Sequence, residues 1–157
     1  MTFVAVLSVG ALACSDTDPV PTVKIVAAAP DMLDPNDDLA DDLSITVEYT
    51  DGDADLGGGV ADVYDCRAAG LVSQLVIPSI ASQEAVDKGV PIEGAMELVV
   101  TDIGDVWPDL RAPSICGDLG VEDPTNGEVV FCVLLTDTAG NVSGGDCTAS
   151  ITVMPSL

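Results

Sequence analysis

Three aspartates alternate in the stretch DGDADLGGG, and this spacing could bring three hard oxygen ligands together. Asp51, Asp53 and Asp55 occupy the first, third and fifth positions of an EF-hand-like spacing, and Asp62 falls at the twelfth. Leu56 stands where an EF-hand requires glycine, and strands rather than helices are expected on both sides, so the stretch is not an EF-hand. A turn that curls alternate side chains inward could still bind Ca²⁺ in a structural role.

The alternative is an ordinary turn with solvated aspartates. In that case Gly57, Gly58 and Gly59 would supply left-handed backbone conformations, and the aspartates would favour the bend. Both interpretations stay open at the level of the sequence, with a slight preference for the ion.

Catalysis is not expected. The chain has no histidine, which removes the commonest general base, the usual partners of Ser and Cys nucleophiles, and most zinc sites. It also has only two Tyr, two Phe and one Trp, too few to line the aromatic cleft in which a glycosidase usually holds its two acids. The glycines at 57–59 lack the downstream Lys-Ser/Thr of a phosphate-binding loop.

The net charge of −23 restricts the partners of the chain. The sequence has 27 acidic residues against four basic ones, so it lacks the clustered Lys and Arg that nucleic acids and anionic membrane surfaces require. Cations are favoured partners. The charge could also serve only to keep an exported protein soluble.

The first residues have the pattern of an export signal. Phe3 to Ala13 form an apolar run that is too short to span a bilayer and fits the core of a signal peptide. We therefore expect a signal peptide over residues 1–13 and a polar tether over 14–21. No Lys or Arg precedes the run, which departs from the usual pattern.

The stretch Ala11-Leu12-Ala13-Cys14 resembles a bacterial lipobox, in which the cysteine is acylated and becomes the first residue of the mature protein. Ala stands here at the position where a lipobox usually has Leu. The resemblance implies that Cys14 is lipidated and that the protein is an exported, membrane-anchored lipoprotein of the cell envelope or outer surface, in contact with the membrane only through this lipid. Simple secretion with cleavage after Ala13 is the alternative.

Short apolar runs alternate with turn residues from Pro21 onward, which predicts an all-β fold. In the clearest run, LSITVEYT, the residues Leu43, Ile45, Val47 and Tyr49 share one face. About seven such strands with frequent turns predict an antiparallel β-sandwich domain over 22–157. The predicted strands are 22–27, 43–50, 60–67, 71–77, 95–102, 128–136 and 147–153.

The remaining segments are assigned from the same patterns. The run 128–136 is apolar on both faces and is expected to be a central strand, and residues 82–88 could form one helical turn. Two acidic loops, 29–42 and 103–127, are expected to be enlarged. The inward residues are predicted to be Val23, Ile25 and Ala27 in the first strand, and Cys147, Ala149, Ile151 and Val153 in the last.

The final hairpin adds two candidate ligands. In a sandwich, the loop between the second and third strands lies at the same end as the final hairpin loop. That hairpin contains Asp137 and Asn141, which could face Asp51, Asp53 and Asp55. The predicted calcium ligands are these five residues. The alternative for Asp137 and Asn141 is a turn with local side-chain capping.

The chain has five cysteines, an odd number that needs an explanation in an exported protein. Lipidation of Cys14 would leave four, which can form two disulfides in an oxidising compartment. A hairpin centred on Ala139-Gly140 places Cys132 opposite Cys147, and the pair Cys66–Cys116 then follows by elimination. Four cysteines allow three connectivities.

ITVEYTDGDADLGG, followed much later by VLLTDTAGNVSGG, resembles the immunoglobulin-like and fibronectin type III-like modules of secreted bacterial proteins. The resemblance implies an Ig-like sandwich that serves in binding, adhesion or spacing at the cell surface, with a protein or glycan as its partner. The alternatives are a periplasmic or extracellular lipoprotein that captures a small ligand or ions, and a stalk fragment of a larger assembly.

Overall fold

The computed structural model describes residues 18–34, 41–67, 70–103, 114–121 and 127–154, and this part of the chain is mostly β-strand. The expectation of an all-β protein is confirmed. Three of its strands have only two residues each. In order along the chain the elements are β1 (Thr22–Ala29), β2 (Met32–Leu33), β3 (Asp41–Asp51), β4 (Val60–Asp65), β5 (Gly70–Val76), α1 (Gln83–Lys88), β6 (Ile92–Ile103), α2 (Ser114–Asp118), β7 (Glu128–Val129), β8 (Phe131–Thr136), β9 (Asp146–Cys147) and β10 (Ile151–Val153).

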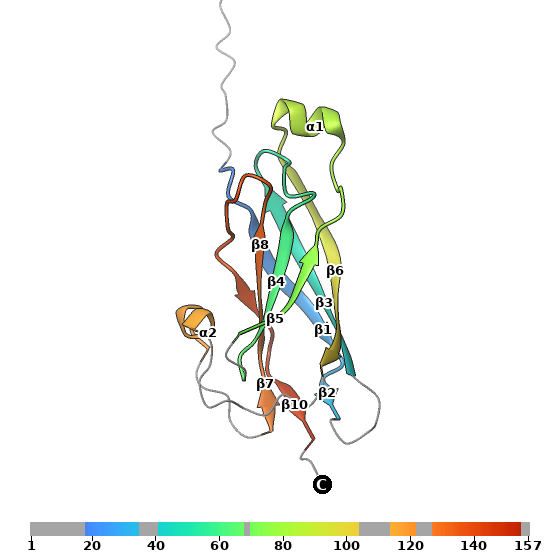
Figure 1. The fold of residues 1–157 in the computed structure, drawn as a ribbon, viewed down its shortest axis with the longest axis vertical. Helices are drawn as coiled ribbons and strands as arrows, with labels where there is room; N and C mark the ends of the chain where they lie inside the picture. The colour runs from blue at the N-terminus through green and yellow to red at the C-terminus, as the bar shows by residue number, and fades with distance from the viewer. Residues whose placement is uncertain (1–17, 35–40, 68–69, 104–113, 122–126, 155–157) are drawn as a thin grey trace, which may run out of the picture.

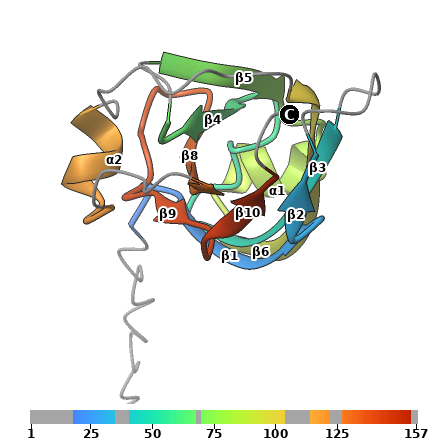
Figure 2. The same ribbon diagram turned by 90° about the horizontal axis from the view of Figure 1, so that it is seen from below.

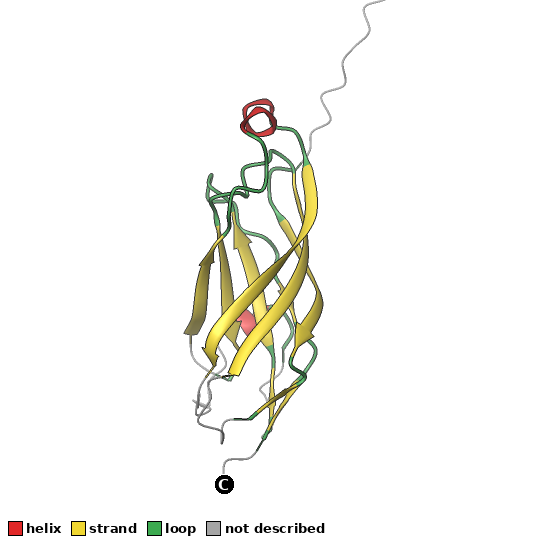
Figure 3. Cartoon of the chain, turned by 90° about the vertical axis from the view of Figure 1, so that its right-hand side faces the viewer, coloured by secondary structure: helices red, strands yellow, loops and turns green. Residues whose placement is uncertain are grey.

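Two larger antiparallel sheets form the body of the molecule. One has the strand order β1-β3-β6 and the other the order β5-β4-β8-β9. Figures 2 and 3 show them as two layers with the core between. A small third sheet, β2-β10-β7, lies at the end opposite α1 (Figure 1). Its β2–β10 pair is parallel, which differs from the purely antiparallel arrangement that we predicted.

Alternating apolar residues of β3 fill the core as predicted. Leu43, Ile45 and Val47 are fully buried and Tyr49 is 8% exposed. They belong to one cluster with buried side chains of β4, β6 and β8, so both large sheets contribute to a single core. Among the described residues, Phe131 is the largest fully buried side chain, and the rest of the core is mostly aliphatic. Each such side chain contributes roughly 1.5–3 kcal/mol through burial.

The predicted inward position of Ala27 in β1 is wrong. β1 pairs with β3, and the register shifts between Ile25 and Ala27. The resulting bulge inverts the alternation, so Ala28 rather than Ala27 packs against the core. A period of two in the sequence cannot reveal an inserted residue, because the strand looks regular on both sides of it.

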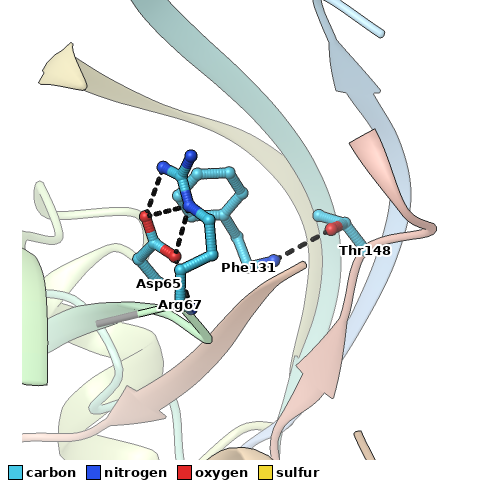
Figure 4. Close-up of polar contacts among 4 residues, drawn as sticks. All are labelled: Asp65, Arg67, Phe131 and Thr148. Atoms are coloured by element: carbon cyan, nitrogen blue, oxygen red, sulfur yellow. Dashed lines mark hydrogen bonds and ion pairs between the residues drawn. The ribbon is translucent and has the colours of Figure 1, made fainter. Parts of the chain in front are cut away.

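The predicted strand 147–153 is also wrong as one element. β9 pairs with β8 in the large sheet, whereas β10 pairs with β7 in the small one. Ala149, which we predicted to point inward, is exposed between them, and Thr148 is buried instead. The Thr148 amide donates to the Phe131 carbonyl at 2.8 Å, and the Phe131 amide donates to the Thr148 hydroxyl oxygen at 3.1 Å (Figure 4). These two hydrogen bonds fix the chain where it passes from β9 in the large sheet to β10 in the small sheet.

The predicted strand 128–136 is also divided into two strands, next to the bonds between Phe131 and Thr148. Val130 separates β7 from β8, and its carbonyl accepts a hydrogen bond from the Cys66 amide at 3.0 Å. β8 itself lies between β4 and β9, which confirms the expectation of a central strand.

The helical turn expected at residues 82–88 is confirmed as α1. The Ser82 side chain accepts a hydrogen bond from the Ala85 amide, which caps the start of the helix, and Gly89 ends it in a left-handed conformation with φ of 56°. α1 connects β5 of one large sheet to β6 of the other (Figure 1).

The two enlarged loops are described only in part. The described portions contain β2 in the first loop and α2 in the second, and residues 35–40, 104–113 and 122–126 lie outside the described residues. So do the predicted signal peptide 1–13 and Cys14. Within the described ranges, none of the helices has the length and apolar character needed to cross a bilayer.

Candidate metal centre

The β3–β4 loop and the turn after β8 meet at the α1 end of the molecule (Figure 1). The Thr138 amide donates to the Asp55 carbonyl at 3.3 Å, and the Thr138 hydroxyl donates to the same carbonyl at 3.2 Å. The Thr138 hydroxyl also lies 3.0 Å from Asp55 Oδ2, and the Ala139 amide donates to that oxygen at 3.1 Å. These contacts bear out the expectation that the two loops lie side by side.

Four aspartates converge where the loops meet. One carboxylate oxygen from each of Asp51, Asp53, Asp55 and Asp137 can be chosen so that all four lie within 4.8 Å of one another. Asp51 ends β3, Asp53 and Asp55 follow in the loop, and Asp137 comes directly after β8. We call these four residues the acidic cluster.

Two residues of the acidic cluster are buried and two are half-buried, and only some of their carboxylate oxygens have hydrogen-bond partners. Asp51 is 1% exposed and Asp137 is 4% exposed. In the described part of the chain, the Oδ1 atoms of Asp51, Asp53 and Asp55 are buried and have no hydrogen-bond partner. A buried carboxylate oxygen without a donor is costly, so native proteins usually provide it with a hydrogen bond or a metal ion.

Four of the other five oxygens of the cluster accept hydrogen bonds within the protein. Asp51 Oδ2 accepts from the Leu56 amide at 2.8 Å. Asp137 Oδ1 and Oδ2 accept from the backbone amide and the Nδ2 of Asn141, both at 2.8 Å. Asp51 and Asp55 thus each have one oxygen fixed by a donor, while the other is buried without a hydrogen-bond partner. This division is typical of carboxylates that bind a metal and are oriented by outer hydrogen bonds.

Burial is the largest influence on the Asp55 carboxyl, and it raises the pKa of this group above its ordinary value of 3.8. The hydrogen bond from the Thr138 hydroxyl lowers the pKa, whereas the neighbouring carboxyls of Asp53 and Asp137 raise it. The net shift is upward, because the negative form lies in a partly buried place beside other negative groups.

The loop backbone explains how the aspartates turn inward. Ala54 has a φ of 66°, a left-handed conformation that costs a residue with a Cβ atom about 1–2 kcal/mol, and its side chain is fully buried. Leu56 is also fully buried and belongs to the main core. The loop is therefore fixed at two positions between and beside the aspartates, and its strain marks a place where function is to be sought.

The glycine run has a different role from the one expected. Among the three glycines only Gly58 has a positive φ, at 91°. A Cβ atom on Gly59 would lie 2.1 Å from the Thr136 carbonyl oxygen, and one on Gly57 would lie 3.0 Å from the Ile80 amide nitrogen. Gly57 and Gly59 are thus required for close approach of the loop to neighbouring backbone rather than for left-handed turns.

The basic residues that the structure describes do not neutralise the cluster. Lys24 pairs with Glu48 at 3.9 Å, and Lys88 pairs with Glu84 at 2.6 Å. Arg67 pairs with Asp65 at 2.7 Å. The α1 C-terminus adds to the negative field, because a Cβ on Gly89 would lie 4.0 Å from the Asp53 Cβ and a helix C-terminus carries partial negative charge.

The donor set fits calcium. Ca²⁺ prefers six to eight hard oxygen ligands, and carboxylates are its commonest protein ligands. Asp51, Asp53, Asp55 and Asp137 would hold the ion, which would supply the positive charge that this end of the molecule lacks. The chemistry that such an ion provides here is structural: it would join the two loops.

The predicted ligand Asn141 and Asp62, the twelfth position of the EF-hand-like spacing, lie outside the acidic cluster. Asn141 contacts the cluster through Asp137, to which its amide groups donate, and its role as a direct ligand remains a prediction. Asp62 lies on β4 and accepts a hydrogen bond from Gln74 Nε2 at 2.8 Å, away from the cluster. Thr138 was missed, because nothing in the spacing of the turn distinguishes it from a solvated threonine.

The predicted disulfides are both present. Cys66 bonds to Cys116 and Cys132 bonds to Cys147, with Cα–Cα distances of 5.9 and 4.1 Å. The two bridges adjoin, with Cys66 Sγ 3.5 Å from Cys132 Sγ, and form a second apolar cluster with side chains near α2. The four cysteines that the structure describes are thus paired with one another.

A buried ion pair was not predicted. Arg67 Nε donates to both carboxylate oxygens of Asp65, and Nη2 donates to Oδ2 (Figure 4). Arg67 is 9% exposed and Asp65 is 0% exposed. The Arg67 amide also donates to Asp65 Oδ1 at 2.7 Å. The ion pair lies at the end of β4, and we assign it a structural role.

Comparison of the chain with protein-family models, with curated proteins and with solved structures found no match. The function is therefore argued from the geometry of the acidic cluster and from the sequence.

Proposed function

We propose that the protein is an exported, lipid-anchored Ig-like module without catalytic activity, which binds a structural calcium ion and serves in binding, adhesion or spacing at the cell surface. The observation that carries this proposal is the acidic cluster, in which three buried carboxylate oxygens lack a donor. The ion would join the β3–β4 loop to the turn after β8 and so make this end of the module rigid.

Electrostatics supports calcium binding. Each close pair of carboxylates repels by about 1–4 kcal/mol, depending on the local dielectric. The buried Asp51 and Asp137 cannot reduce this cost by turning toward water, because their other hydrogen bonds fix them. A divalent cation converts the repulsion into attraction. We expect weak binding, with a Kd of about 10⁻⁴–10⁻³ M as in extracellular modules.

The strand order supports the Ig-like assignment. Immunoglobulin constant-type domains place their first, second, fourth and fifth strands in one sheet, and their third, sixth and seventh in the other. Here β1, β3 and β6 share one large sheet and β4, β8 and β9 share the other, which agrees with that order. β5 departs from it, because it pairs with β4 at the edge of the second sheet.

The cysteine pairing supports the lipid anchor. Two disulfides fit an oxidising compartment outside the cytoplasm. Cys14 is left over, directly after an apolar run and a small-residue stretch that resembles a lipobox. Acylation would use this thiol.

Two measurements on protein extracted from membranes test the proposal. Mass spectrometry under denaturing conditions should find a chain that begins at Cys14 and carries acyl mass. Titration calorimetry of the folded protein with calcium should find binding that is lost in Asp53→Ala. A mature chain without acyl mass would rule out the anchor, and wild-type protein that takes up no calcium would rule out the ion.

A further inference from the structure

The chain that carries α1 crosses from one large sheet to the other at the end of the molecule where the acidic cluster lies (Figure 1). Ile80 and Ile92, on either side of α1, pack against the main core. We call residues 81–91 between them the α1 segment. None of the side chains of α1 is buried. A helix of six residues is marginal in water without tertiary packing, so the order of the α1 segment depends on what it contacts.

The residues that lead into the α1 segment contact the glycine run of the β3–β4 loop. The Gly58 amide donates to the Ile77 carbonyl, and the Ile77 amide donates to the Gly59 carbonyl, both at 2.9 Å. A Cβ atom on Gly57 would lie 3.2 Å from the Ser79 Cα, so the two backbones are in direct contact. A change in the shape of this loop would therefore be transmitted to the start of the α1 segment.

The C-terminal end of α1 lies beside the acidic cluster. A Cβ atom on Gly89, which caps α1, would lie 4.0 Å from the Asp53 Cβ. A helix C-terminus carries partial negative charge, and Glu84 and Asp87 on α1 outnumber Lys88. A calcium ion would offset two of the four negative charges of the cluster. The repulsion between the cluster and α1 is therefore stronger without the ion than with it.

We propose that calcium in the acidic cluster keeps the α1 segment closed against the β3–β4 loop, and that the segment opens when calcium is removed. The inference rests on the calcium site of the proposed function and assigns that site a regulatory role. Without the ion, repulsion among the four carboxylates displaces Asp53, and its contact with Gly89 is lost. Ile80 and Ile92 remain packed against the core. Calcium shifts the population toward the closed form, because it binds that form better.

The expected affinity suits such a switch. An extracellular site with a Kd of about 10⁻⁴–10⁻³ M loses its ion when calcium becomes scarce, whereas a tighter site would stay filled. Opening would expose the half-buried Ala85 and Val86, and would make the bond after Lys88 accessible to a protease that cuts at basic residues. The calcium supply would thus control both the surface that the module presents at this end and its resistance to proteolysis.

Trypsin tests the switch, because it cuts after basic residues and the chain has only four of them. Lys88 on α1 and Lys24 on β1 are matched sites, with side chains 63% and 73% exposed. Lys24 lies within a strand that pairs with β3, so cleavage there requires β1 to detach. In chelator, cleavage after Lys88 is expected to be faster than cleavage after Lys24 by about tenfold or more. Calcium at about tenfold above its Kd should slow the cleavage after Lys88 by about tenfold.

Two variants and a second measurement support the assignment. Asp53→Ala removes a predicted ligand, so calcium should leave its cleavage after Lys88 unchanged, and this variant also controls for effects of calcium on trypsin itself. Asp62→Ala, which removes an acid outside the cluster, should keep the slowing. The amides of Gly89 and Val90 donate to carbonyls within α1, both at 3.0 Å, and should exchange hydrogen about tenfold more slowly with calcium.

Titration calorimetry on the same wild-type protein separates this inference from the proposed function. Calcium uptake with unchanged cleavage and exchange in α1 would overturn the switch and leave the calcium site in force. Equal rates of cleavage after Lys88 and Lys24 in chelator would overturn it too, because α1 would then open only when the whole fold loosens. Wild-type protein that takes up no calcium would overturn both the switch and the site.

Discussion

The hydroxyl of Thr138 donates a hydrogen bond to Asp55 Oδ2 over 3.0 Å, and this contact joins two loops that are 83 residues apart in the sequence. It neutralises part of the charge of one oxygen of Asp55, while the Oδ1 of the same residue is buried without a hydrogen-bond partner. Thr138 thus sets the orientation of a predicted calcium ligand without being one.

Thr138→Val is expected to destabilise the protein by about 1 kcal/mol, because it removes the hydroxyl and keeps the shape of the side chain. It should also weaken calcium binding, since Asp55 would no longer be held in place. Denaturant unfolding with and without calcium measures both effects. Thr138→Ser, which retains the hydroxyl, is the control and should behave like wild type. Equal losses in Val and Ser variants would show that the hydroxyl has no such role.

The effect of Asp53→Ala on stability is expected to be favourable without calcium and unfavourable with it. In chelator the variant is expected to melt at a higher temperature than wild type, because one of four repelling carboxylates is gone. With calcium tenfold above Kd, wild type should gain about 1.4 kcal/mol and the variant little. Thermal melting at constant ionic strength measures this. Asp62→Ala, which removes an outward charge on β4, is the control for net charge. If calcium stabilises the two variants equally, the loop is only a turn.

The raised pKa of Asp55 predicts a pH effect in chelator. A carboxyl whose pKa is higher in the folded state than in the unfolded state destabilises the fold when ionised, and this cost disappears as the pH falls through the folded pKa toward 3.8. Asp55→Asn should therefore be more stable than wild type at neutral pH, and the difference should shrink in acid. The free energy of unfolding of both proteins between pH 7 and 4 tests the sign. A difference that grows in acid contradicts the assignment.

Arg67→Met should be among the most damaging single changes outside the apolar core. It leaves the fully buried Asp65 carboxylate without its partner, at a cost of about 3–5 kcal/mol. The double variant Asp65→Leu, Arg67→Met should recover most of that loss, because it removes both charges together. Lys24→Met breaks an exposed pair and should cost less than about 1 kcal/mol. Urea unfolding of the three variants gives the order, and a double variant no better than the single one would refute it.

The two disulfides should differ in their contribution to stability. The Cys66–Cys116 bridge spans 50 residues and Cys132–Cys147 spans 15, so paired replacement by serine should cost about 4 and about 3 kcal/mol. Denaturant midpoints of the two double variants test this order. Non-reducing peptide mapping of the wild type checks the pairing, and a peptide that links Cys66 to Cys132 would contradict it.

Much of the fold follows from local sequence patterns. The alternation of Leu43, Ile45 and Val47 identified the face of β3 that is buried, because successive side chains of a strand point to opposite sides. Residues 82–88 predicted α1, since capping is a local interaction between neighbours in the chain. The hairpin turn placed Cys132 opposite Cys147 for the same reason.

The errors arose where pairing with a distant strand overrides the pattern. The bulge after Ile25 depends on the register of β1 against β3, and no period along one strand can contain that information. The break between β9 and β10 depends on the bonds of Thr148 with Phe131, which lies in another strand.

Some features of the candidate metal centre follow from the sequence, and others depend on the tertiary structure. The sequence by itself determined that Asp51, Asp53 and Asp55 alternate beside a tight turn, which is a property of spacing. The expected sandwich topology also predicted that Asp137 joins them. Tertiary structure decided that Asp51 is 1% exposed and that three oxygens lack donors. Burial and the supply of hydrogen bonds depend on which segments cover a residue. That information resides in the packing of β8 and α1 against the loop.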